Sequence, residues 1–462
     1  MRIPALARGG AIVGGTWVIG GGSASTRWLG IWCATLCWAG LESAPVLAGE
    51  LAYGGGYSLA YDNNITRVPT DPIAEFTQTL FGGFGYEERT ADLNMRLVTQ
   101  VERRNYLRNT YVEEKAYYVN GSALWTISPQ KLTWILDDYA SQIPISYATV
   151  DTPTNRTNAN GLNTGPDLTL RLNPVDAAIV GARYGRLDIQ GPGDNERYSA
   201  YVRGLHQISP NTNVSLNYLT TRVNFQDSET FSNYSLDAWF LRYQLLPSPS
   251  GMTVEAGTAR IQQERLETPP PGRYGRFVLF YPITREATLS ASLERQYSDA
   301  AIELLGGVTS AAQQPPAASK VSITAVSGPF YGKRGDLGFD YGGARFQVIA
   351  RGFVRSVDYL QSDQSYEERN THLECNWFSG PARIRAYLDS VKRTFLDFFQ
   401  EDRNRAAGVV FGYRVNRFMG LSVEGSRLDG SSTATQNNFV DRRVSFALSF
   451  STGSLYPAAT RR

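Results

Sequence analysis

Residues 51–62 read LAYGGGYSLAYD, and large side chains alternate with small or polar ones along the stretch. A period of two places the two sets on opposite faces of one β-strand. The stretch therefore predicts a strand with an apolar face and a polar face. The large set is Leu51, Tyr53, Tyr57, Leu59 and Tyr61, and the other set is Ala52, Gly54, Gly56, Ser58, Ala60 and Asp62.

The same alternation returns along the rest of the chain. After Ala48 no apolar run exceeds seven residues, so the sequence predicts no membrane-spanning helix there. It predicts many short strands instead. Clear copies of the alternation cover residues 91–98, 287–294, 382–389, 407–413 and 444–450.

Short turns rich in Pro, Asn and Gly alternate with longer polar connections. Such turns do not fit inside a β-ladder, and they fall at residues 128–130, 173–176, 209–211, 247–251, 282–284, 342–343 and 379–381. The longer connections include residues 143–166, 264–272, 298–335 and 429–438. Residues 298–335 are expected either at the surface or folded into the lumen. Nine short and ten long connections predict about twenty strands, with 16 and 18 still open.

Composition agrees with a chain built from strands. Aromatic residues reach 12%, with 26 Tyr and 44 Gly, while charged residues are 19% and the mean hydropathy is −0.29. Aromatic side chains favour strands, and Gly costs about 1 kcal/mol in a helix relative to Ala. Divided among twenty strands, residues 49–462 give about 21 residues for each strand and its connection, which suits a membrane strand of ~10 residues.

A soluble β-sandwich would also contain alternating strands, so the two classes have to be compared. Here the apolar faces mix Tyr, Phe, Leu, Ala and Gly, and the opposite faces carry charges far along each strand. An apolar face in contact with lipid and a charged face that lines a water-filled lumen explain this pattern. Unpaired backbone groups at a sheet edge are not tolerated in lipid, so the sheet has to close. We therefore expect an all-β, transmembrane, antiparallel up-and-down barrel over residues 49–451, with short periplasmic turns and longer extracellular loops, in a bacterial outer membrane.

The N-terminus has the features of an export signal. Arg27 precedes an apolar run over residues 28–38, and the sequence Ala-Pro-Val-Leu-Ala ends at Ala48. This predicts a cleaved signal peptide over residues 1–48, with Gly49 as the first mature residue. A membrane anchor is the alternative, but the run is shorter than the ~20 residues that a bilayer requires. The long stretch before Arg27 is either an extended n-region or the product of an upstream start codon.

The last alternating strand ends in Phe450. Its apolar positions resemble the C-terminal signal read by the barrel-assembly machinery, and they are Val444, Phe446, Leu448 and Phe450. Residues 452–462 would then form a short periplasmic tail. The machinery and the outer-membrane lipid or lipopolysaccharide are the expected partners.

The sequence offers no catalytic or metal-binding pattern, so we expect a protein that is not an enzyme and has no cofactor. His206 stands in a strand and no Gly-x-Ser-x-Gly motif is present, although a hydrolase that uses His206 is an alternative. His372 and Cys375 lie an odd number of residues apart and would face opposite sides of a strand. Removal of Cys33 and Cys37 with the signal peptide leaves Cys375 alone, which allows no disulfide. A net charge of +2 without basic clusters predicts no nucleic-acid binding.

The alternation also predicts which charged side chains line the lumen. One interpretation is that these charges pair between strands and rigidify the wall; the other is that they form a path for polar or weakly anionic solutes. The expected lining residues are Arg96, Arg183, Arg203, Arg351, Arg355, Arg383, Arg385, Arg414, Asp92, Glu102, Asp389 and Glu424, together with Glu255 and Glu294.

Three short motifs resemble the β-barrel porin type 2 family. They are YDNNITR at residues 61–67 with Pro69 and Thr70, GPDL at residues 165–168, and Pro329-Phe330 before a strand at residues 337–341. The resemblance implies an outer-membrane pore for polar solutes that is linked to exopolysaccharide production or export. An accessory barrel of an export assembly without an open pore is the alternative, with polysaccharide or export-system proteins as further partners.

Overall fold

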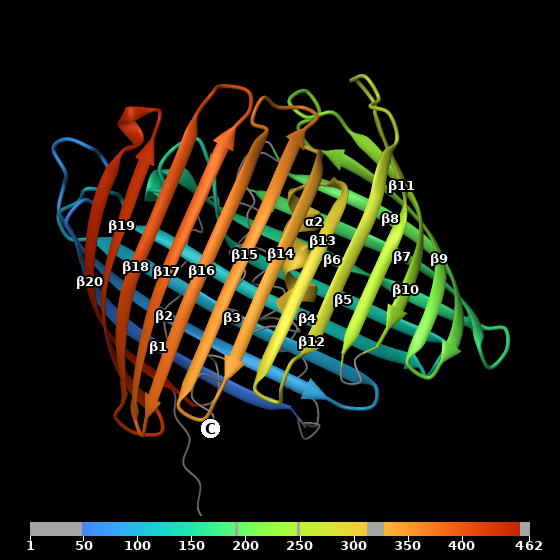
Figure 1. Ribbon diagram of the computed structural model, residues 1–462, viewed down its shortest axis with the longest axis horizontal. Coiled ribbons are helices and arrows are strands. Elements are labelled where there is room, and N and C mark those ends of the chain that lie inside the picture. Colours follow the sequence, from blue (N-terminus) through green and yellow to red (C-terminus); the bar gives the residue numbers. More distant parts are fainter. Residues whose placement is uncertain (1–48, 190–192, 247–249, 312–327, 453–462) are drawn as a thin grey trace, which may run out of the picture. The chain divides into compact units, whose positions relative to one another are not determined.

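A single closed sheet forms the structure. The computed structural model describes residues 49–189, 193–246, 250–311 and 328–452. Twenty antiparallel strands run through these residues, and each pairs with the next along the chain. β1 also pairs with β20, from Gly54 opposite Ser451 to Asp62 opposite Arg443, so the sheet closes and no strand is left as an edge. The predicted all-β antiparallel barrel of twenty strands is confirmed (Figure 1).

The strands are 11 to 16 residues long, which is sufficient to cross a membrane at a tilt. Their bounds are β1 Glu50–Asp62, β2 Glu75–Arg89, β3 Leu93–Tyr106, β4 Glu114–Ser128, β5 Leu132–Pro144, β6 Arg156–Arg171, β7 Asp176–Ile189, β8 Asn195–Ser209, β9 Thr212–Phe225, β10 Tyr234–Leu245, β11 Gly251–Gln263, β12 Gly272–Pro282, β13 Ala287–Ser298, β14 Phe330–Gly342, β15 Phe346–Tyr359, β16 Tyr366–Ser379, β17 Ala382–Phe395, β18 Glu401–Arg414, β19 Met419–Ser432 and β20 Phe439–Ser451.

Short and long connections alternate without exception, as the sequence predicts. The short turns share one end of the barrel, where β1 begins and β20 ends. The longest connection, between β13 and β14, contains the helix α2 (Ala300–Ala311), and the 3-10 turns η1 (Pro153–Asn155) and η2 (Thr435–Asn437) lie in two others. Within the described residues no helix is long and apolar enough to span a bilayer.

Three predicted connections are too long. Residues 330–335 of the connection predicted at 298–335 belong to β14, and residues 429–432 of the one predicted at 429–438 belong to β19. The largest error concerns β6. Residues 143–166 were expected as a loop, but residues 156–166 belong to β6, which pairs with β5 on one side and β7 on the other. Asn and Thr side chains, which suggest a loop, here bond within the wall, as in the 2.7 Å hydrogen bond from Asn160 to Asp138. Gly165, at φ +157°, allows close approach to β7, because a Cβ there would lie 2.0 Å from the Ala182 carbonyl oxygen.

Register assigns each side chain to one of the two faces. In β1 the large residues of the opening stretch point outward, and Leu51 and Tyr53 are 61% and 54% exposed. The smaller residues point inward, and the pairing carries this division from strand to strand around the barrel. The outer face therefore presents an apolar band to lipid. The predicted signal peptide, residues 1–48, lies outside the described residues, as does the predicted tail after Thr452.

Candidate functional site

The helix α2 lies inside the barrel. In Figure 1 it stands between the wall that contains β13–β15 and the wall that contains β4–β8. Asp299 begins the helix, because its carboxylate accepts a 2.9 Å hydrogen bond from the Ile302 amide, as an N-cap does. The sequence left open whether this connection enters the lumen, and the structure places its helix there.

Apolar contacts fix α2 against one wall. Ala301 and Leu304 are fully buried against inward-facing residues of β5, β6 and β7. A Cβ at Gly161 would come within 3.0 Å of the Leu304 side chain, so the absence of a side chain there makes room for the helix. The wall residues in this contact are Ile143, Ala159, Leu187 and Ile189, each 2% exposed or less.

Charged contacts hold the first turn of α2 from two sides. The Asp299 carboxylate lies 2.8 Å from the Arg197 guanidinium on β8, and the Tyr234 hydroxyl of β10 donates to the same carboxylate. On the other side, Glu303 lies 3.3 Å from the Arg355 guanidinium on β15. Because removing one member of a buried ion pair leaves an uncompensated charge, such pairs fix their partners firmly. The helix is therefore bound to both walls.

The ionisation of Asp299 follows from these contacts. Burial on its own raises the pKa of a carboxyl group. The charge of Arg197, with the hydrogen bonds from Arg197, Tyr234 and the Ile302 amide, outweighs burial and holds the pKa of Asp299 below its ordinary value. Asp299 is thus an anion at neutral pH.

A second segment crosses the loop end of the lumen. The β5–β6 connection, residues 145–155, leaves one wall and reaches the other. Its Tyr147 ring lies 3.7 Å beneath the Arg393 guanidinium of β17, and burial raises the pKa of Tyr147. The Ala148 carbonyl oxygen accepts hydrogen bonds from Gln400 at 3.0 Å and Asn437 at 2.9 Å. This connection is thus tied to the β17–β18 and β19–β20 connections.

Most of the predicted lumenal residues lie on the inner face by register. Arg183 pairs with Asp167 at 2.6 Å, Arg351 with Asp340 at 2.9 Å, and Glu102 with Arg104 at 2.5 Å. Glu255 pairs with Arg242 at 2.6 Å, Asp389 accepts from His372 at 2.7 Å, and Glu424 accepts from the Tyr387 hydroxyl at 2.8 Å. The remaining inward-facing members are Arg96, Arg203, Arg355, Arg383, Arg385, Arg414 and Glu294.

Asp92, expected in the same set, lies instead in the β2–β3 turn, because β3 begins at Leu93. His206 is exposed near the turn end and lies 2.7 Å from Asp176. His372 faces the lumen, whereas Cys375 is exposed on the outer face. The assembly-signal residues Val444, Phe446, Leu448 and Phe450 all lie on the outer face of β20.

Sequence reasoning missed the residues that hold α2, among them Arg197 and Glu303. Nothing in the strand pattern distinguishes Arg197 from other inward arginines, because its partner Asp299 is 102 residues away. The one available signal was the run Ser298-Asp299-Ala300-Ala301, in which Asp precedes helix-forming residues as an N-cap does.

Comparison with known proteins yields structural similarity only. No family model and no curated protein matches the sequence. The fold is similar to the ferric enterobactin receptor PfeA from Pseudomonas aeruginosa, at 10% identity over 87% of this chain and 81% of that chain, with a TM-score of 0.44. It is similar to the FrpB iron transporter from Neisseria meningitidis with the same identity, coverage and TM-score. The copper transporter OprC matches at 11% identity over 89% and 82%, with a TM-score of 0.42.

The chain is an outer-membrane β-barrel, because its sheet is closed and its outer face is an apolar band. The functional expectation needs correction. The expected porin-like channel linked to exopolysaccharide, and the accessory export barrel kept as its alternative, have no counterpart among these structures, which are named as receptors and transporters. The resemblance to the β-barrel porin type 2 family stays a prediction, since no family model matches.

Proposed function

We propose that this barrel is a selective outer-membrane transporter whose lumen is closed at rest by α2 and the β5–β6 connection. Solute passes only when these two segments move. The observation that carries the proposal is the attachment of the first turn of α2 to both walls, through Arg197 on one side and Arg355 on the other. A freely open pore has no need for buried ion pairs across its lumen. Separating either pair while one partner stays buried would leave an uncompensated charge, which opposes movement of α2.

The β5–β6 connection supports the same function. It crosses above the lumen and is held by a cation–π contact and by two hydrogen bonds to its backbone. These contacts come from three separate connections or strands, so a ligand that binds at the loop end can compete with several of them at once. Local opening of a lid on a rigid scaffold is a common way to gate a passage.

Conductance in planar bilayers tests the proposal. The wild-type protein is expected to show little steady conductance, and a variant that lacks residues 300–311 is expected to conduct several-fold more. The matched control is deletion of residues 266–268 from the exposed β11–β12 connection, which should leave the conductance unchanged. Heat-modifiable migration shows that each barrel is folded. A wild-type conductance as large and steady as that of the variant without α2 would overturn the proposal.

A further inference from the structure

A band of basic side chains lies on the outer face of β16–β20, near the loop end. Pairing places Arg369, Lys392 and Arg403 directly opposite one another on β16, β17 and β18. Two outward rows nearer the membrane centre, Arg427 of β19 stands directly opposite Arg442 of β20. Arg405 lies between these rows on β18. We call these six residues the basic belt.

The belt lacks enough acidic partners. Lys392 pairs with Glu401 at 2.9 Å, and Arg427 pairs with Asp429 at 2.9 Å. Among the described residues, Arg369, Arg403, Arg405 and Arg442 form no ion pair. Like charges directly opposite each other in a sheet are destabilising. An external anion placed over the belt removes this repulsion, and the two rows call for an anion with more than one charged group.

The surface below the belt is apolar. Continuing towards the turn end, the next two outward rows of β17 and β18 hold Ala386, Val409, Ile384 and Phe411. These are lipid-facing positions, and a change from apolar to basic side chains marks the level of the lipid headgroups. The anion that the belt binds is therefore placed where lipid phosphates lie.

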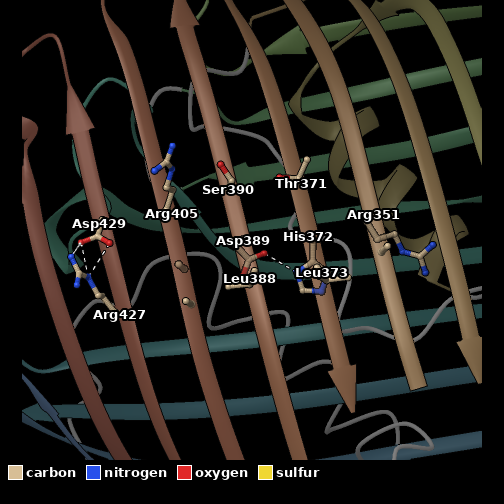
Figure 2. Close-up of a pocket in the computed structure, with 13 residues that line it drawn as sticks. Arg351, Thr371, His372, Leu373, Leu388, Asp389, Ser390, Arg405, Arg427 and Asp429 are labelled. Carbon is tan, nitrogen blue, oxygen red and sulfur yellow. Dashed lines mark hydrogen bonds and ion pairs between the residues drawn. The ribbon is translucent and has the colours of Figure 1, made fainter. Parts of the chain in front are cut away.

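A trough joins the belt to the apolar surface. It has a volume of about 640 Å³ and crosses β15–β19 between two rows of outward side chains. The row nearer the turns includes Leu373 and Leu388, and the row nearer the loops includes Thr371, Ser390 and Arg405 (Figure 2). Ala407 lies opposite Leu388 in the row nearer the turns. Leu373 and Leu388 are 45% and 56% exposed, so the trough opens outward and not into the lumen. Arg427 lies at its end beside Asp429.

The opposite wall has no such arrangement. On the outer face of β7–β10, Arg186 and Arg222 are mixed with Asp188, Glu196 and Asp237. Arg222 has a carboxylate partner, Glu264, at 3.2 Å. The β7–β10 wall therefore lacks the net positive charge of the wall that carries the trough.

We infer that the outer face of β15–β20 is a binding site for a phosphorylated membrane lipid, whose phosphates contact the basic belt and one of whose acyl chains lies in the trough. Charge complementarity selects the phosphates, since arginine binds them in a bidentate manner. The apolar wall of the trough selects an amphiphile over a free phosphate. The site is independent of the lumen and of its closure.

Binding of purified diphosphorylated lipid A to the full-length barrel in detergent tests the inference. The double variant R405Q/R442Q is expected to bind lipid A at least tenfold more weakly. The matched control R186Q/R222Q makes the same change of charge on the opposite wall and should bind as the wild type does. Equal binding by R405Q/R442Q and the wild type, or an equal loss in the control, would overturn the inference.

A second variant tests the trough. A407W fills the trough without changing the charge. We expect it to bind lipid A more weakly, but to bind a diphosphorylated glucosamine lipid with short acyl chains as the wild type does. Inorganic pyrophosphate distinguishes the two sources of phosphate. The site would not be specific for a lipid if pyrophosphate displaced lipid A with an inhibition constant equal to the dissociation constant of lipid A. The same would follow if A407W bound lipid A as tightly as the wild type does.

Discussion

Arginines on the two faces of this barrel have opposite surroundings. Inside, Arg197 and Arg355 are less than a tenth exposed, and each pairs with a carboxylate of the α2 segment. Outside, Arg405 and Arg442 are exposed, and within the described part of the chain they have no carboxylate partner. The inner arginines find their anions within the chain, which fixes a closed lumen. The outer arginines are left for an anion from the surroundings.

The largest effect expected from this difference concerns Asp299. Asp299→Ala removes the N-cap of α2 and leaves Arg197 and Tyr234 buried without their acceptor. We expect the attachment of α2 to lose about 3–5 kcal/mol. Hydrogen exchange should show at least about a hundredfold faster exchange in α2, while the strands remain protected. Asp227→Ala, in the exposed β9–β10 connection, is the matched control. Unchanged exchange in α2 would contradict the role assigned to the pair.

The same carboxylate gives the closed state a pH dependence. The pKa of Asp299 is lower when the segment is folded than its ordinary value of 3.8. Its contribution to stability is therefore present above pH 3.8 and is lost as the pH falls through the folded pKa. We expect bilayer conductance to rise only below about pH 4. Asp299→Asn should conduct more than the wild type at neutral pH and should lack this acid step.

The apolar contacts that hold α2 against the wall are expected to contribute somewhat less to its attachment than Asp299 does. Leu304→Ala leaves a cavity between α2 and the β5–β7 wall and should destabilise the attachment by about 2–4 kcal/mol. Leu305→Ala is the matched control, because Leu305 is only partly buried. Exchange in α2 measures both variants. An effect of Leu305→Ala as large as that of Leu304→Ala would show that packing against the wall is not specific.

The architecture could be predicted because it depends on local patterns. A period of two decides which side chains face lipid, and Pro, Asn and Gly decide where the chain turns. Both are visible within ten residues, so the strand count and the alternation of connections are confirmed. The error at residues 156–166 came from the same rule, because a strand rich in Asn and Thr resembles a loop until its partners are known.

The closure of the lumen by α2 and the β5–β6 connection could not be predicted in this way. Its contacts join residues far apart in sequence, such as Arg197 with Asp299 and Glu303 with Arg355. The basic belt is similar, because Lys392 and Arg403 lie opposite each other only through the register of β17 with β18. Sequence alternation assigned the face of each residue but not the neighbour that it meets.

A smaller effect is expected near the wall that supports α2, at Asp194. Its carboxylate accepts a 2.7 Å hydrogen bond from the Ile189 amide, and burial raises its pKa to about 6. Since the folded pKa is raised, its favourable contribution is full below pH 3.8 and is lost as the pH rises through about 6. Urea unfolding in detergent should show a loss of roughly 1 kcal/mol between pH 4 and pH 7. Asp194→Asn should not show this loss of unfolding free energy between pH 4 and pH 7. If the variant had the same pH profile as the wild type, another group would be the cause of the loss.

The smallest effect is expected on the outer face. Arg405→Ala removes an exposed side chain without an ion-pair partner among the described residues, so the free energy of unfolding in a neutral detergent should change by less than about 0.5 kcal/mol. Arg197→Ala under the same conditions should cost several kcal/mol, because Asp299 stays buried. Adding lipid A should then stabilise the wild type more than R405A, since only a bound anion makes use of the outer arginine. A large loss in R405A without lipid would mean that the outer face, like the inner one, is held by contacts within the chain.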